Sequence, residues 1–436
     1  MNKFEELREK YPVFNYDGYK INRNAETINI EYNFSIDNLD SFKTCWTIPY
    51  KNINSEKILD KLIFSLGLVE AISYYKLTCA KQINIKCNKL TLNQIKFFKK
   101  LFYNGLGEFM FKNNINISED ELFKFNYDET NEEVLHDSSA YKDILVPVGG
   151  GKDSCVSIEL LKNNNITLFS INPNETIKNV INVSNINNDI KVERKLDNKI
   201  LDYNSKGFLN GHTPFSAIVA FSTFITAYLN GIKYIALSNE SSANESTVKG
   251  SSINHQYSKS LEFENDFINY AKSLTDSDIH YFSFLRPLKE IQIASLFSKF
   301  DKYHSVFRSC NVGSKKGIWC SACAKCLFVY IVLCPFIKEE ALIKIFGKKV
   351  LDNKELEEDF KGLIGVNENK PFECVGTRLE VLAALNTYIK SNSSYLTDIY
   401  KDFIIKSNAS LDSLIKDFDS NNNVPSVLVS NIKEAL

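Results

Sequence analysis

Residues 144–154 have the sequence ILVPVGGGKDS, and this stretch decides the fold class. An apolar, β-like run leads into three glycines, and an apolar helical pattern follows to residue 161. Because glycine has no Cβ atom, the amides of Gly149–Gly151 can close on phosphate oxygens. A helix that starts at Asp153 and Ser154 adds further N–H groups and a favourable dipole. The stretch therefore predicts a strand, a phosphate-binding turn and a helix.

The spacing excludes a Walker A loop, which needs the pattern G-x-x-x-x-G-K-[ST]. The run instead resembles the S-G-G-x-D-S signature of the PP-loop ATP pyrophosphatases, with Gly149 in place of the usual first serine. That family cleaves ATP between the α and β phosphates, so the resemblance implies an ATP site. A glycine turn between a strand and a helix of an unrelated α/β protein is the alternative.

From this stretch onward, strands and helices alternate. Asn172-Pro173 follows an apolar run, and Gly231 ends an apolar helix that begins at Thr213-Pro214. Repeated β-α units predict an α/β fold with a doubly wound parallel sheet, in which ligands bind outside the carboxyl ends of the strands. The expected elements are strands 144–148, 167–171 and 234–238 and helices 153–161 and 214–229.

We expect three regions along the chain. Residues 1–135 mix β-like and helical pieces and predict an α+β N-terminal domain. The PP-loop ATP-binding domain is expected over residues 140–345, and a mainly helical C-terminal region over 346–436. Residues 118–137 are rich in Asn and acidic residues and are expected to form a linker. Within the N-terminal domain, the expected strands are 27–33 and 82–87 and the expected helices are 55–71 and 92–102.

Four cysteines form a C-x9-C-x2-C-x2-C pattern. Cysteines spaced by two residues can face the same ion, and four thiolates complete the closed tetrahedral shell that structural zinc prefers. We therefore predict a structural zinc with no open position for water. Unligated thiols and a redox C-x-x-C pair are the alternatives. The predicted ligands are Cys310, Cys320, Cys323 and Cys326.

The 436-residue chain has an ordinary globular composition, with 44% hydrophobic and 24% charged residues and a formal net charge of −1. This charge gives no global field for nucleic acid or anionic lipid, so we expect no nucleic-acid and no membrane partner. The N-terminus lacks the apolar core of a secretion signal, and the best apolar run, residues 326–337, is too short to span a bilayer. We expect a cytoplasmic protein, and the sequence does not indicate an oligomeric state.

Several polar runs lie where a protein core does not need them. Their histidines, basic residues and Glu-Cys pair suit a polar, anionic substrate. The runs are NGHTP (210–214), SNE (238–240), NHQYSKS (254–260), LRPL (285–288) and KPFECVG (370–376).

Together with the glycine loop and the WCxxCxKC stretch, these runs occur in the same order in the UDP-N-acetylmuramoyl-L-alanyl-L-glutamate epimerases. AISYYK (71–76) and NGLGEF (104–109) are also similar to that family, and the resemblance extends from about residue 67 to 384. It implies ATP-dependent inversion of the terminal L-Glu of UDP-MurNAc-L-Ala-L-Glu to D-Glu in peptidoglycan precursor biosynthesis. The implied route is a carboxyl-adenylate that releases AMP and diphosphate, and the implied partner is this small nucleotide-sugar dipeptide.

The resemblance and the residue chemistry together indicate three groups of site residues. The ATP group is Gly149, Gly150, Gly151, Lys152, Asp153, Ser154 and Asn172, with Mg²⁺ bridging the phosphates. The substrate-binding group is Asn239, Glu240, Lys259 and Arg286. The acid–base candidates, which the sequence does not rank, are His212, His255, Glu373 and Cys374.

Two other functions remain open at this point. A similar cysteine cluster follows the PP-loop domain of 7-cyano-7-deazaguanine synthase, so nucleobase or tRNA modification is the first alternative. A zinc-stapled nucleotide-binding module without catalysis is the second. Release of pyrophosphate with candidate substrates separates the three functions.

Overall fold

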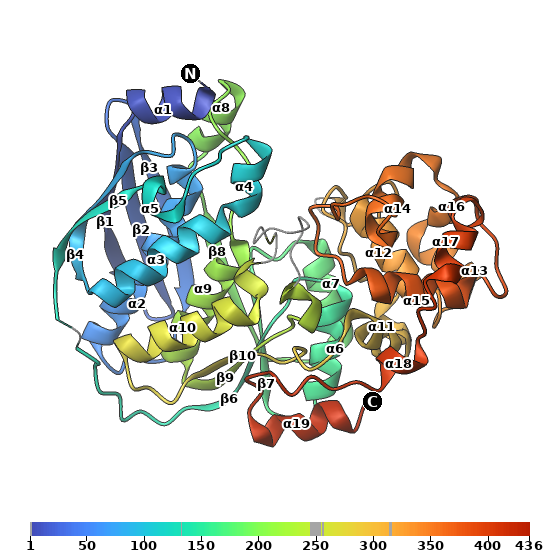
Figure 1. The fold of residues 1–436 in the computed structure, drawn as a ribbon. Helices are drawn as coiled ribbons and strands as arrows, with labels where there is room; N and C mark the ends of the chain where they lie inside the picture. Colours follow the sequence, from blue (N-terminus) through green and yellow to red (C-terminus); the bar gives the residue numbers. More distant parts are fainter. Residues whose placement is uncertain (1, 132, 245–253, 255–256, 314–315) are drawn as a thin grey trace. The chain divides into compact units, whose positions relative to one another are not determined.

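The computed structural model describes residues 2–131, 133–244, 254, 257–313 and 316–436 of a mixed α/β protein (Figure 1). The chain forms two compact units, and each unit is assembled from three separate segments. The first unit comprises residues 1–145, 190–235 and 257–281, and the second comprises 146–189, 236–256 and 282–436. The segments of the two units alternate along the sequence.

Six strands of the first unit form a mixed sheet. They are β1 (Val13–Arg23), β2 (Thr27–Ile36), β3 (Asp40–Pro49), β4 (Gln82–Leu90), β5 (Lys124–Glu129) and β8 (Asp189–Lys195). The strand order is β8-β3-β2-β1-β4-β5. Neighbours from β8 to β1 pair antiparallel, whereas β4 runs parallel to both β1 and β5. In β2, apolar and polar side chains alternate, so every second residue from Ile28 to Ile36 is buried.

The first unit also contains eight described α-helices. They are α1 (Lys3–Lys10), α2 (Glu56–Tyr75), α3 (Leu92–Gly105), α4 (Gly107–Lys112), α5 (Glu119–Leu122), α8 (Lys199–Ser205), α9 (Phe215–Asn230) and α10 (Leu261–Leu274). Helix α2 packs on β1 and β2 and is buried along most of its length, and α9 contacts β3. Gly67 permits this close approach, because a Cβ there would lie 2.0 Å from the hydroxyl of Tyr16 and 2.8 Å from the ring of Tyr32.

Four strands reach into the second unit and carry its loops. They are β6 (Lys142–Pro147), β7 (Ile166–Ile171), β9 (Ile232–Leu237) and β10 (His280–Ser283), in the order β10-β9-β6-β7. β6 and β9 run parallel, with Ile144 opposite Tyr234. Their carboxyl ends therefore lie at the same edge, and the glycine loop and the SNE run begin there.

The rest of the second unit is helical. Its helices are α6 (Lys152–Leu161), α7 (Glu175–Ser184), α11 (Glu290–Ser298), α12 (Ala324–Leu333), α13 (Glu339–Phe346), α14 (Glu357–Ile364), α15 (Arg378–Tyr388), α16 (Tyr395–Ile399), α17 (Lys401–Lys406), α18 (Asp412–Ile415) and α19 (Ser426–Lys433). Helix α12 is buried over all ten residues and packs against α11, α14 and α15. The mainly helical C-terminal region predicted from the sequence is confirmed for the described residues beyond 346.

The strands and helices predicted from the sequence are confirmed as β2, β4, β6, β7, β9, α2, α3, α6 and α9. Gly231 ends α9 in the left-handed conformation, with a φ of 68°, whereas Pro214, and not Thr213, is the N-cap residue of this helix. The linker expected over residues 118–137 is partly wrong, because α5 and β5 lie within it. β5 is an edge strand with only half-buried and exposed side chains, so its sequence carries little apolar signal.

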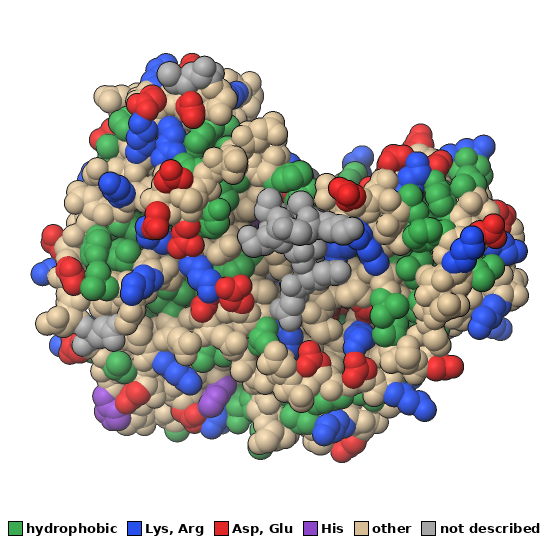
Figure 2. All heavy atoms as spheres, in the orientation of Figure 1, with side chains coloured by type: hydrophobic (Ala, Val, Ile, Leu, Met, Phe, Trp, Pro, Cys, Tyr) green, Lys and Arg blue, Asp and Glu red, His purple; other side chains and the backbone are tan. Residues whose placement is uncertain are grey.

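Among the described helices, none is both long enough and apolar enough to cross a membrane. On the face that Figure 2 shows, acidic and basic side chains are interspersed rather than gathered by sign. This mixture agrees with the formal net charge of −1.

Candidate functional site

The glycine loop joins β6 to α6 in the second unit, as the sequence predicts. Helix α6 begins at Lys152, and its N-cap residue is Gly151, which supplies no side-chain cap. The first amides of an α-helix have no carbonyl partners within the helix. The start of α6, which includes Asp153 and Ser154, therefore offers amides and a positive dipole end to an anion held by the loop.

Two glycines of the loop are used in different ways. Gly150 has a φ of 83°, and a Cβ there would lie 2.8 Å from the methyl group of Thr176, so only glycine fits without strain. Its carbonyl accepts a hydrogen bond of 2.9 Å from the amide of Arg308. A Cβ at Gly149 would meet no described atom within 4 Å. The space beside Gly149 is thus open, and the serine of the PP-loop signature would fit there.

The side chain of Lys152 is buried between two carboxylates. It is 1% exposed and forms ion pairs with Asp153 and with Glu290, the first residue of α11. Burial lowers the pKa of Lys152, but the two carboxylates outweigh it and hold that pKa well above its ordinary value. Burial raises the pKa of Glu290 to about 8, although Lys152 opposes the shift. Lys152 therefore stays charged between its two carboxylate partners.

The residues that follow β9 and β10 are fastened to each other in the second unit. Arg286 is fully buried and donates to the carbonyl of Glu240 at 2.5 Å and to Oγ of Ser283 at 3.2 Å. Asn239 donates to the same Ser283 oxygen at 3.0 Å. Glu240 is buried, whereas Asn172, which follows β7 with a φ of 45°, is exposed. The guanidinium of Arg286 thus holds the end of β9 in place.

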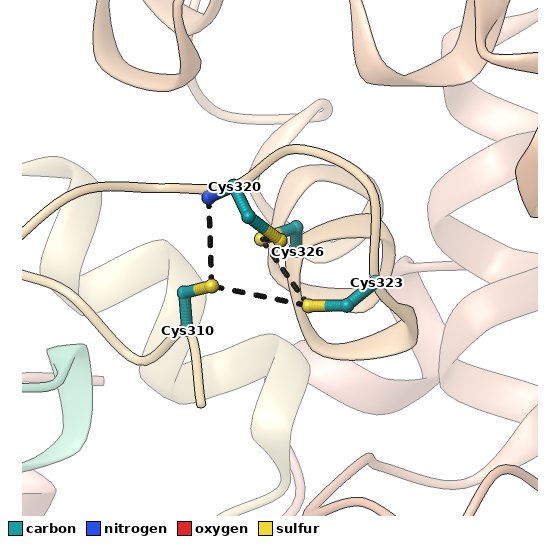
Figure 3. A group of neighbouring side chains, drawn as sticks. All are labelled: Cys310, Cys320, Cys323 and Cys326. Atoms are coloured by element: carbon teal, nitrogen blue, oxygen red, sulfur yellow. Dashed lines mark hydrogen bonds between the residues drawn. The ribbon is translucent and has the colours of Figure 1, made fainter. Parts of the chain in front are cut away.

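The four predicted metal ligands do converge. All four sulfur atoms lie within 4.8 Å of one another, and Figure 3 shows them facing a common centre. The Sγ–Sγ distances are 3.5 Å for Cys323–Cys326, 3.6 Å for Cys320–Cys326 and 4.0 Å for Cys310–Cys323. A tetrahedral Zn–S₄ site with bonds of about 2.3 Å has sulfur atoms about 3.8 Å apart. The cluster therefore has the size of a closed metal site.

The surroundings of the cluster favour a thiolate at Cys323. The amide of Gly313 donates to Sγ of Cys310 at 3.1 Å, and Cys323 is the N-cap residue of α12. Hydrogen bonds from Cys326 lower the pKa of Cys323 to about 5, while burial raises the pKa of Cys320 to about 11. One thiolate thus forms readily, and binding of a divalent cation would displace the protons of the others.

The cysteine cluster also holds the loop that carries Glu373 and Cys374. Asn311, which directly follows Cys310, donates to Oε2 of Glu373 at 2.5 Å. Lys325, which lies between two of the cysteines, is buried and donates to the carbonyl of Cys374. Both acid–base candidates of this loop are half-buried and are attached to the segment that the cysteines fold.

The other predicted residues lie in the first unit or outside the described residues. His212 precedes α9, and its Nδ1 is 3.6 Å from Oε2 of Glu108, which is buried in α4. Lys259 is half-buried in the turn Tyr257–Lys259. His255 lies outside the described residues. The structure therefore brings His212 together with an acidic partner.

Sequence reasoning missed four residues that the structure places in these clusters. The sequence contains only a weak signal for them. Two lie in the segments 71–76 and 104–109, which resemble the epimerase family. One lies between two of the cysteines, and one is the first residue of α11. All four are charged residues that are almost fully buried, which single-sequence patterns do not report. The residues are Lys76, Glu108, Lys325 and Glu290.

Comparison with protein families accounts for both the glycine loop and the cysteines. The MurL N-terminal domain matches residues 5–284, which include the loop, and the MurL C-terminal domain matches residues 304–412, which include all four cysteines. The chain belongs to the MurL family. The C-terminal MurL match also contains Glu373 and Cys374, and the N-terminal match contains Glu108 and His212.

Three curated relatives carry the name UDP-N-acetyl-alpha-D-muramoyl-L-alanyl-L-glutamate epimerase. The relative from Xanthomonas oryzae pv. oryzae is 31% identical over 350 residues, which cover 78% of this chain and 77% of the relative. The relative from Salinispora tropica is 33% identical over 356 residues, or 78% of this chain and 76% of the relative. The relative from a Micromonospora species is 32% identical over 336 residues, or 75% and 74%. No solved structure matches the chain, so the MurL assignment rests on sequence.

Proposed function

We propose that this protein is an ATP-dependent epimerase that converts the terminal L-Glu of UDP-MurNAc-L-Ala-L-Glu to D-Glu. The observation that supports this reaction is the similarity, over three quarters of the chain, to the three curated UDP-N-acetyl-alpha-D-muramoyl-L-alanyl-L-glutamate epimerases. The observation that supports ATP is the glycine loop, with its open space at Gly149 and the helix start that follows it. Modification of a nucleobase or of tRNA has no comparable support.

Activation of the carboxylate explains why an epimerase would use ATP. Removal of the α-proton beside a carboxylate puts a second negative charge next to the first, so that proton is very weakly acidic. In the proposed reaction a carboxylate oxygen attacks the α-phosphorus of ATP, and the bond to diphosphate breaks. In the acyl-adenylate the former carboxylate no longer carries a charge, so the α-proton can pass to a base and a proton can be taken up on the opposite face. Water then hydrolyses the adenylate to the D-Glu form of the dipeptide substrate and AMP.

Residues of the second unit suit the ATP-binding part of this reaction. Gly149, Gly150, Gly151 and the helix start at Asp153 and Ser154 would hold phosphate oxygens. Asp153 could bind Mg²⁺, which usually takes few protein carboxylates, and Asn172 lies exposed at the end of a neighbouring strand. We propose that Lys152 acts indirectly, by neutralising Asp153 and Glu290, because its ammonium group is buried between them.

The proposed substrate residues fall into two kinds. Asn239 and Lys259 are half-buried and could contact polar or anionic substrate groups. Arg286 and Glu240 are buried and bonded to each other, so we propose that they fix the end of β9 beside the substrate. His212, His255, Glu373 and Cys374 are the proposed acid–base groups.

The cysteine cluster would bind one structural zinc. Its sulfur spacing fits a tetrahedral S₄ site, and four thiolates leave no position for a catalytic water. We propose that the zinc fixes the fold of residues 310–326 and thereby the loop attached to it.

The ATP part of the proposal is tested by two glycine variants that introduce the same kind of backbone strain. Gly150→Ala puts a methyl group against Thr176 at a φ of 83°, whereas Gly347→Ala has a φ of 79° and no described atom within 4 Å. We expect wild type to form AMP and diphosphate only with UDP-MurNAc-L-Ala-L-Glu present, and Gly150→Ala to lose about ten- to a hundred-fold in kcat/KM for ATP, from one or two charge-assisted hydrogen bonds. Gly347→Ala should keep the wild-type rate. Formation of ADP and phosphate, or equal rates for all three proteins, would contradict the assignment.

The epimerisation itself is tested in heavy water. Turnover should place deuterium at Cα of the product glutamate, and this labelling should require ATP. Asp153→Ala should abolish both labelling and AMP formation. Unlabelled D-Glu product, or labelling without ATP, would exclude the adenylate route.

A further inference from the structure

The described histidines differ sharply in the carboxylates they face. Four of the five histidines of the chain are described, and each lies within 4 Å of an acidic side chain. Three of these partners are surface aspartates that are 47%, 54% and 92% exposed, whereas the partner of His212 is Glu108, which is 5% exposed. The exposed pairs are His136–Asp276, His280–Asp278 and His304–Asp301.

A buried carboxylate beside one ring nitrogen makes the other nitrogen a better base. Glu108 faces Nδ1 of His212 at 3.6 Å, so its charge favours a proton on Nδ1 and leaves Nε2 as the acceptor. The same carboxylate would stabilise the imidazolium that forms when Nε2 takes up a proton. Lys112, four residues after Glu108, forms an ion pair with it. The ring of His212 is 30% exposed, so a reactant can reach it.

Several contacts within the first unit fix the segment that precedes His212. The ammonium of Lys76 donates to the carbonyl of Gly211 at 2.7 Å, and Asn113 donates to the carbonyl of Asn210 at 3.1 Å. A Cβ at Gly211 would lie 3.1 Å from the ring of Phe109, so the backbone touches α4 directly. These contacts fix the backbone immediately before His212, as a proton-transfer group requires.

The burial of Lys76 in this contact costs folding free energy. Its side chain is buried, and its donation is to two neutral oxygens, those of Gly211 and Asn210. Burial lowers the pKa of Lys76 to about 8. A neutral side chain in this space would cost less folding free energy than a buried ammonium. The ammonium is therefore better explained by its hydrogen bonds, which hold the backbone before His212 in position.

We propose that His212 exchanges the proton at Cα of the activated glutamate and that Glu108 is its positioning residue. This inference rests on the function proposed above. In one direction, the lone pair of Nε2 takes the α-proton, the C–H electron pair moves into the acyl group, and the resulting enolate is protonated on the opposite face by a second acid. In the other direction, the imidazolium of His212 is that acid.

Three single variants test this assignment. His212→Ala removes the proton-transfer group, Glu108→Gln keeps the shape of the positioning residue and removes its charge, and His280→Ala removes a histidine whose partner is an exposed aspartate. Each protein is assayed for ATP- and substrate-dependent diphosphate release and for deuterium at Cα in heavy water. His212→Gln serves in place of His212→Ala if the latter does not fold.

We expect His212→Ala to release diphosphate at a rate close to that of wild type and to lose Cα labelling by about a hundred- to ten-thousand-fold. Imidazole in the buffer should restore part of that labelling, which a purely structural role of His212 would not allow. Glu108→Gln should lower labelling by at least about tenfold, because the imidazole loses its orientation and its counter-charge. His280→Ala should behave as wild type.

The outcomes separate this inference from the proposed function. If wild type releases diphosphate and labels Cα, but His212→Ala labels at the wild-type rate, the proposed function stands and the assignment of His212 is wrong. Loss of labelling without any rescue by imidazole would also overturn it. If wild type neither releases diphosphate nor labels Cα, the proposed function fails and the inference fails with it.

Discussion

Replacement of Lys76 by methionine should change how the stability of the protein depends on pH. In the folded protein, burial lowers the pKa of this lysine from 10.5 to about 8. Between these values the unfolded chain binds more protons at this site than the folded chain, so wild type gains stability as the pH rises. Methionine has no such proton, and the difference in unfolding free energy between the two proteins isolates the contribution of Lys76.

The size of the effect follows from the two pKa values. Each unit of pKa difference corresponds to about 1.4 kcal/mol, so the charged ammonium costs the folded state about 3 kcal/mol at neutral pH. Part of this cost disappears as the amine loses its proton. Between pH 7 and pH 9.5, the unfolding free energy of wild type should therefore rise by about 2 kcal/mol relative to that of Lys76→Met.

Urea unfolding followed by tryptophan fluorescence measures this difference. The chain has two tryptophans, and Trp46 is buried in the first unit, where Lys76 lies. A Trp319→Phe background removes the signal of the second unit. Lys20→Met, at an exposed position of β1, is the control and should follow wild type at every pH. If the unfolding free energies of wild type and Lys76→Met differ by a constant amount from pH 7 to 9.5, the ammonium of Lys76 is not buried as described. The proposed role of Lys76 in fixing the backbone before His212 would then be wrong as well.

Two further predictions concern the cysteine cluster. The purified protein should contain one zinc per chain, and Cys323→Ser should lose both the metal and several kcal/mol of folding free energy, as elemental analysis and thermal unfolding would show; active protein without any metal would exclude the zinc site. Lys325→Met should keep the zinc but lower the rate of epimerisation by about tenfold or more, because it removes the charge-assisted hydrogen bond to the carbonyl of Cys374. Lys344→Met, at an exposed position of α13, is its control, and equal rates for the two variants would show that the loop does not depend on Lys325.

The local geometry that the sequence predicts correctly is formed by neighbouring residues. The glycine loop combines a β-like run, three glycines and a helical pattern within 18 residues, so its geometry follows from local preferences. The cysteines that follow one another at C-x2-C spacing converge for the same reason, and Cys310, ten positions before Cys320, joins them. Such features need no knowledge of tertiary contacts.

The missed residues owe their surroundings to segments that are distant in sequence. Glu108 meets His212 across about a hundred residues, and Glu290 meets Lys152 across 138. A single sequence contains no signal for such pairs, because a charged residue in a helix is usually exposed. The edge strand β5 was missed for a related reason, since its pairing with β4 and not its own composition makes it a strand.

The buried charges of the second unit suggest why the cysteine cluster and the glycine loop occur together. Glu290 lies between them: it pairs with Lys152 of the loop helix, and the positive charge of Lys325 in the cysteine segment also acts on it. A Cβ at Gly376 would lie 3.1 Å from the Cβ of Glu290, so the loop of Glu373 and Cys374 touches the same side chain. A buried carboxylate is tolerated only while its cationic partners stay in place. Because the cysteines fix the position of Lys325, a bound metal would hold this carboxylate, the glycine loop and the Glu373–Cys374 loop in one arrangement.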